Sequence, residues 1–257
     1  MSVDSKDGGY VNLHVENGVG TITFFHPSHN SMPGYLLKSL SETITGAGER
    51  NDILVVVLKS DGDRSFCAGA SFDELISIRD FDEGKKFFSG FANVINAMRT
   101  CPKFIIGRVQ GKAVGGGIGI ASATDYCFAT KAAAIKLSEL AVGIGPFVVG
   151  PAVERKMGIS AMSQMAINAT EFHSAEWALQ KGLYNAIFDT TDEMDEAIQT
   201  LTSKLVLSNP EAMSMLKKVF WHGTDDWDKL LEKRAEKSGK LVLSDFTRNA
   251  IEKFKAK

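Results

Sequence analysis

The stretch Gly111–Gly119, GKAVGGGIG, decides the fold that we expect for this chain. It follows an apolar run, Phe104–Val109, that predicts a buried strand, and it leads into a short apolar helix. Glycines let a ligand approach the backbone closely. The first turn of a helix has N–H donors without acceptors and a partial positive charge. The stretch therefore suits a developing oxyanion or a phosphate, although a tight strand-to-helix turn would use the same glycines.

A second stretch of small residues, Phe66–Ser71 (FCAGAS), also links an apolar strand to a helix. On its own it is typical of an ordinary surface loop. Two such loops, each ending a buried strand, can however direct one N–H apiece at a single point. One donor of this kind contributes about 3–4 kcal/mol to the stability of a transition state.

A third stretch, Ser138–Phe147 (SELAVGIGPF), contains a lone carboxylate among apolar residues. Glu139 follows a short predicted strand and precedes a loop that contains glycine and proline. A carboxyl group in apolar surroundings has a raised pKa and can serve as a general base or acid. A solvated loop glutamate or a helix-capping partner is the alternative at this position.

Composition excludes several classes of function. The 257 residues carry a net charge of -2, so nothing indicates an electrostatic grip on nucleic acid or on an anionic membrane. Three widely spaced cysteines predict neither a disulfide framework nor a zinc site. The N-terminal residues lack an apolar signal core and no apolar run is long enough to span a bilayer, so we expect a cytoplasmic protein. The chain has no P-loop and no G-x-S-x-G motif.

Apolar patterning predicts an α/β chain with a change of character near Gly158. Two β-branched runs flank the hairpin signal Asn17-Gly18, and a helix that opens at Pro33 is expected to stop at Gly46 or Gly48. After Gly158 the chain is mostly helical, at about 160–169, 174–181, 192–206, 210–221, 225–242 and 245–256. No linker separates the halves. We therefore expect one domain, 1–257, with a core at about 10–158 and a helical C-terminal extension at about 159–257.

In their order and spacing, these segments resemble the crotonase (enoyl-CoA hydratase/isomerase) superfamily. The resemblance runs from about Tyr10 to the end of the chain. It rests on two oxyanion-loop segments, a catalytic-glutamate segment, a later signature and a closing helix: Ser65–Ala70, Gln110–Gly117, Leu137–Leu140 with Gly143 and Pro146, His173–Ala178 with Gly182-Leu183, and Ala250–Phe254.

The resemblance implies a spiral of ββα units and a helical C-terminal region that builds homotrimers or dimers of trimers. It implies an acyl-CoA thioester as substrate, with coenzyme A as part of that substrate and no separate cofactor or metal. The thioester carbonyl would accept hydrogen bonds from the N–H groups of Ala70 and Gly116, beside a catalytic Glu139. Coenzyme A would contact Ala68, His29 and Lys253, the last in the same or a neighbouring subunit.

One departure from the family pattern bears on the reaction. Hydratases of the family usually carry a second glutamate two residues after the triple glycine, where this chain has Gly119. The run Gly143–Phe147 resembles Δ3,Δ2-enoyl-CoA isomerases, which use a single glutamate. We therefore expect isomerisation, with hydration by Glu139 alone and a non-catalytic acyl-CoA-binding or assembly subunit as alternatives. Phe147 and Val148 are expected to form the wall of an apolar acyl pocket.

Overall fold

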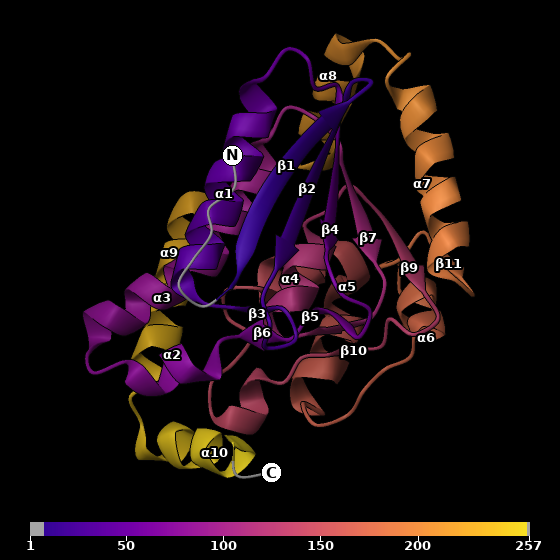
Figure 1. Ribbon diagram of the computed structural model, residues 1–257. Coiled ribbons are helices and arrows are strands. Elements are labelled where there is room, and N and C mark those ends of the chain that lie inside the picture. Colours follow the sequence, from indigo (N-terminus) through magenta and orange to yellow (C-terminus); the bar gives the residue numbers. More distant parts are fainter. Residues whose placement is uncertain (1–7, 256–257) are drawn as a thin grey trace.

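A hairpin and four parallel strands build the main sheet of the computed structural model, which describes residues 8–255 (Figure 1). Strands β1 (Tyr10–Glu16) and β2 (Val19–Phe25) pair antiparallel across Asn17 and Gly18, whose φ angles of 49° and 81° are those that a two-residue hairpin turn requires. The sheet order is β1-β2-β4-β7-β9-β11, with β4 (Val55–Ser60), β7 (Ile105–Val109), β9 (Tyr126–Thr130) and β11 (Ala186–Phe188).

Two small sheets lie at the carboxyl ends of the main strands. One has the order β10-β8-β5, with β5 (Ser65–Cys67), β8 (Lys112–Val114) and β10 (Ile135–Lys136), and the other pairs β3 (Ser31–Met32) with β6 (Gly69–Ala70). Strands β5, β8 and β10 each follow one strand of the main sheet, and each precedes helical structure. After β5 come α2 (Phe72–Ser77) and α3 (Phe81–Thr100), and after β8 comes α4 (Gly116–Ser122). After β10 come the 3-10 helix η1 (Glu139–Val142) and α5 (Gly150–Ile167). This repeated order confirms the predicted spiral of ββα units.

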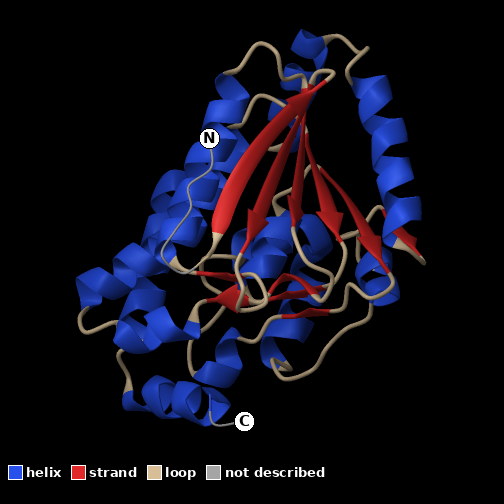
Figure 2. Cartoon of the chain, in the orientation of Figure 1, coloured by secondary structure: helices blue, strands red, loops and turns tan. Residues whose placement is uncertain are grey.

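Apolar clusters lie on both faces of the main sheet, but one face stays open over the β1-β2 hairpin, where His14 is exposed (Figure 2). Side chains of β4 alternate between two apolar clusters. Val56 and Leu58 belong to the large core that also contains α1 (Gly34–Glu49), α3 and α4, whereas Val55 and Val57 pack with Met194 of α7 (Thr191–Leu205). The sheet therefore separates a large core on the side of the small sheets from a smaller one under α7.

The C-terminal region is helical, as predicted, although its limits differ. It consists of α6 (Ala175–Gln180), α7, α8 (Pro210–Phe220), α9 (Trp227–Leu241) and α10 (Asp245–Lys255). Helix α5 begins at Gly150, inside the predicted core region, and is interrupted at Gly158, whose φ of 80° and ψ of 158° are not helical, so two helical segments meet at the boundary drawn from the sequence. Trimerisation by this region stays a prediction. Within residues 8–255, every helix is too short or too polar to span a bilayer.

A buried ion pair attaches α8 to the sheet. Lys217 Nζ lies 2.8 Å from Asp125 Oδ2, and the two side chains are only 2% and 5% exposed. The backbone carbonyl of Lys103 accepts a further hydrogen bond from Lys217, and Trp221 Nε1 donates to Asp125 Oδ1. Because both charges are desolvated, these added hydrogen bonds are what makes their burial tolerable.

Helices α3 and α9 cross at a pair of buried glycines. A Cβ added at Gly84 would lie 2.8 Å from the carbonyl oxygen of Gly239, and one added at Gly239 would lie 2.6 Å from Lys85 N. These distances are shorter than van der Waals contact, so any side chain would push the helices apart. The crossing brings the C-terminal half of α9 against the large core.

We expect Gly239→Ala to destabilise the protein although alanine is the better helix former. The added methyl group overpacks the crossing, which costs about 1–3 kcal/mol. Gly46→Ala is the matched control, because Gly46 lies in α1 with open space at its Cβ position and should gain about 0.5–1 kcal/mol. Urea unfolding measures both. Equal gains in the two variants would contradict a close crossing.

Candidate active site

The two glycine- and alanine-containing loops lie side by side. Strands β5 and β8 are parallel neighbours, with Cys67 opposite Ala113, so the loops that follow them leave the same edge of the small sheet. A Cβ added at Gly69 would lie 2.9 Å from the carbonyl oxygen of Val114 and 3.6 Å from Gly116 N. The loop before α2 and the start of α4 are thus in direct backbone contact.

Helix α4 begins at Gly116, beside the pocket described below. The first N–H groups of a helix have no intrahelical acceptor, and here the N-cap, Gly115, has no side chain that could accept from them. A Cβ at Gly116 would overlap the ring of Phe91, so only glycine fits there. Ala70 lies across the loop contact and lines the same pocket. Two main-chain segments therefore border one small volume.

Glu139 lies against the backbone of Gly115. Gly115 has φ 52° and ψ -117°, a conformation that disfavours any side chain. A Cβ there would lie 3.2 Å from Glu139 Oε1, so the glycine also makes room for the carboxylate. The N–H of Gly115 donates to the carbonyl of Lys136 at 2.8 Å, which joins the start of α4 to the segment that carries Glu139.

Burial controls the protonation of Glu139. Its Oε2 atom is buried and has no hydrogen-bond partner among the described residues. Desolvation raises the pKa of this carboxyl group from 4.5 to about 7, and a hydrogen bond to its own backbone offsets only part of this effect. A group with such a pKa can both take up and release a proton near neutral pH.

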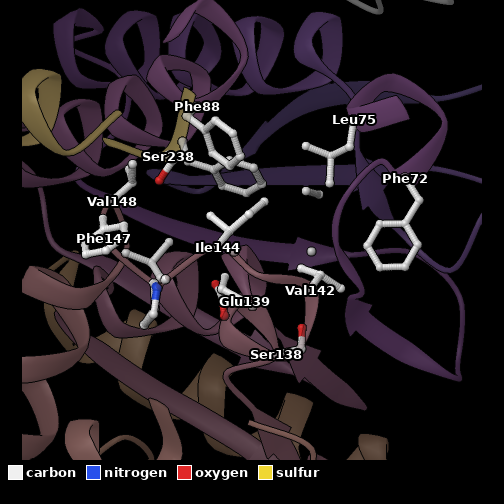
Figure 3. A pocket seen from close by; sticks show the side chains of 18 of the residues that line it. Phe72, Leu75, Phe88, Ser138, Glu139, Val142, Ile144, Phe147, Val148 and Ser238 are labelled. Carbon is white, nitrogen blue, oxygen red and sulfur yellow. The ribbon is translucent and has the colours of Figure 1, made fainter. Parts of the chain in front are cut away.

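An apolar pocket opens above Glu139 (Figure 3). The residues expected to form its wall, Phe147 and Val148, line it, and so does Ala68. Further walls come from α2, α3 and the segment after η1, namely Phe72, Leu75, Phe88, Phe91, Val142, Ile144 and Val149. The polar side chains of the lining are Ser138 and Glu139 at one side, with Ser238 of α9 beside Phe88 and Val148 at the other.

Gly119 is buried in α4, and the space beside it is filled. A Cβ at this position would lie 2.5 Å from Val149 Cγ1 and 2.6 Å from Val149 Cβ. Val149 also lines the pocket. An apolar side chain from α5's N-cap therefore occupies the place where a side chain at position 119 would begin.

Two sequence-predicted contacts lie outside the pocket lining. His29 is exposed in the loop after β2, where its carbonyl accepts a hydrogen bond from Ser65 Oγ. Lys253 is exposed on α10, a helix that packs against η1. Their roles in binding coenzyme A stay predictions. Over the described part of the chain, no group of three or more His, Cys, Asp or Glu side chains could hold a metal ion.

Sequence reasoning missed the pocket residues of α2, α3 and α9. Phe88 and Phe91 follow helical spacing, which indicates burial but does not distinguish a pocket wall from the core. Ser238 is a lone serine in a charged helix, and no local pattern marks it.

This chain is similar in sequence and in fold to several known proteins. A family model described as Enoyl-CoA hydratase/isomerase matches residues 14–254. A short-chain-enoyl-CoA hydratase of Clostridium acetobutylicum is 28% identical over 94% of this chain and 93% of its own length. A peroxisomal Delta(3,5)-Delta(2,4)-dienoyl-CoA isomerase of Arabidopsis thaliana is 22% identical, with coverage of 94% and 91%. The crystal structure of an enoyl-CoA hydratase from Bacillus halodurans superposes with a TM-score of 0.87 at 21% identity, covering 95% of this chain and 99% of that one.

The raised pKa of Glu139 predicts a pH-dependent stability. The folded protein holds this proton more tightly than the unfolded chain does, so the free energy of unfolding falls as pH rises from 4.5 through about 7. At ~1.36 kcal/mol per pKa unit, this loss amounts to about 3 kcal/mol. Glu139→Gln has no such loss, so it should be more stable than the wild type above pH ~8, by up to this amount, and equally stable near pH ~4.

Urea unfolding over this pH range measures the difference. Glu154→Gln, on the exposed side of α5, is the control and should follow the wild type. If Glu139→Gln also parallels the wild type at every pH, the carboxylate is not desolvated.

Proposed function

Since this chain belongs to the enoyl-CoA hydratase/isomerase family, we propose that it is an acyl-CoA enzyme that isomerises 3-enoyl-CoA to 2-enoyl-CoA, the Δ3,Δ2 reaction. In this proposal Glu139 is the single acid and base. The observation that carries the proposal is the position of the Glu139 carboxylate, whose Oε2 is buried and has no partner among the described residues, beside two neighbouring backbone loops in a largely apolar pocket.

In the proposed reaction the thioester oxygen accepts hydrogen bonds from the N–H groups of Ala70 and Gly116. Glu139, as the carboxylate, removes a proton from C2, and the electron pair moves onto the thioester oxygen as a dienolate. The same carboxyl group then returns the proton to C4, which moves the double bond into conjugation. Donors aimed at the charged oxygen stabilise the dienolate most, since it carries more charge there than the substrate does.

The surroundings of Gly119 favour isomerisation over hydration. Hydration needs a water molecule held beside the substrate and a proton for carbon, which family hydratases obtain with a second glutamate. Position 119 has no side chain, and Val149 fills the adjoining space. A proton shuttle between two carbons needs one base and no bound water, and a largely apolar lining with a single carboxylate supports this assignment.

A hydratase that relies on Glu139 alone is the second candidate. It is favoured by the names of relatives: the matched proteins of Clostridium acetobutylicum and Bacillus subtilis are called short-chain-enoyl-CoA hydratase and probable enoyl-CoA hydratase. In that case Glu139 would activate water and also deliver the proton. A protein that binds acyl-CoA without turnover is the third possibility.

Incubation with each enoyl-CoA distinguishes these candidates through the absorbance of the conjugated thioester. We expect a rise with 3-enoyl-CoA in the wild type, at a rate that increases with pH through about 7 as Glu139 becomes the carboxylate. Glu139→Gln should lower this rate by about 10²–10⁴-fold, because the base is lost, while binding of a saturated acyl-CoA is retained. A fall with 2-enoyl-CoA would assign hydration instead. Unchanged turnover in Glu139→Gln, or none in the wild type, would refute the isomerase mechanism.

A second acid can be introduced to test the argument about position 119. Gly119→Glu alone should destabilise the protein, since its Cβ would overlap Val149. Val149→Gly removes both overlapping atoms and leaves Val149 Cα at 3.4 Å, an ordinary contact. The double variant should therefore recover stability relative to Gly119→Glu and hydrate 2-enoyl-CoA faster than Val149→Gly does. A wild type that already hydrates as fast as the double variant would show that the second acid is unnecessary.

A further inference from the structure

The pocket contains a polar atom that the proposed reaction does not use. Ser238 of α9 lines the pocket and is only 1% exposed. Its neighbours in the lining are the apolar Phe88 and Val148, on the side away from Ser138 (Figure 3). The hydroxyl group therefore lies in the part of the pocket that an acyl chain would occupy, beyond the reacting carbons.

Ser238 makes no side-chain hydrogen bond to the described residues. Serine and threonine within a helix commonly donate to the carbonyl four residues earlier. Thr43 and Thr202 do so, at 2.8 and 2.9 Å. The bonds of Ser238 are backbone bonds of α9, among them one in which its carbonyl accepts from Val242 N at the end of the helix. A buried hydroxyl without a partner is unfavourable, so a ligand group that satisfies it would bind more tightly than one that does not.

The fold holds Ser238 in this place rigidly. The next residue, Gly239, is the α9 member of the close glycine crossing with Gly84 of α3. Phe88 lies one helical turn after Gly84 on α3. The crossing therefore fixes the backbone positions from which both the serine and the aromatic side chain reach the pocket.

We propose that Ser238 selects acyl chains that carry an uncharged hydrogen-bonding group, a hydroxyl or a carbonyl, several carbons from the thioester. This inference rests on the proposed function, since it takes the apolar pocket as the acyl site. A carboxylate fits less well, because the lining has no cationic side chain to compensate a buried charge. A purely hydrocarbon chain would leave the serine hydroxyl unsatisfied.

The test compares two saturated, unreactive acyl-CoA series of short and medium length by titration calorimetry. One series ends in a hydroxyl group and the other in a methyl group at the same chain position. At the length that reaches Ser238, we expect the wild type to bind the hydroxyl chain about tenfold more tightly, the effect of one satisfied buried hydrogen bond. Ser238→Ala should lose or invert this preference, whereas Ser163→Ala, a helical serine outside the pocket lining, should keep it.

Each outcome bears on one claim. Tighter binding of the methyl chain at every length, or a preference that persists in Ser238→Ala, would refute the role of Ser238 and leave the proposed function intact. Failure of both series to bind at any length would refute the proposed function, and this inference with it.

Discussion

The contact between two backbone segments, the loop through Gly69 and the start of α4 at Gly116, is the constraint on which the rest of the site depends. It follows from the parallel pairing of β5 with β8, which delivers both loops to one edge of a small sheet. A side chain at Gly69 could not stand between them, because its Cβ would lie 2.9 Å from the Val114 carbonyl oxygen. Main-chain amides brought together in this way are positioned by the fold itself and need no reorganisation during a reaction.

The same absence of side chains sets the protonation of Glu139. Because Gly115 has no Cβ, the carboxylate can lie against the backbone, where it is removed from water, and desolvation brings its pKa to about 7. Close approach, burial and the altered pKa are therefore consequences of a single backbone geometry.

Much of this could be predicted from the sequence, for identifiable reasons. The Asn17-Gly18 hairpin and the buried strands follow from local chemistry. The three loop segments could be identified because their order and spacing along the chain can be read from the sequence alone. Gly46 and Gly48 did not end α1 as expected, since both take helical angles and Gly48 gives Cys101 and Pro102 room to approach. The onset of α5 at Gly150 was missed because a glycine-proline stretch is typical of a loop. The distant helices that line the pocket, with Ser238 among them, depend on tertiary packing that no local pattern encodes.

The filled space beside Gly119 argues that the single carboxylate is a property of the whole site and not the loss of one residue. A glutamate replaced by glycine alone would leave a cavity, which is costly in a packed interior and would admit water if its lining were polar. Here Val149 occupies that volume, and it adds an apolar side chain to the pocket wall. Over the described residues, Glu139 is then the only side chain of the pocket lining that titrates near neutral pH, and the proposed proton shuttle requires no other. The packing around Gly119 and the proposed chemistry are thus consistent with each other, since both involve a single carboxylate in this part of the pocket.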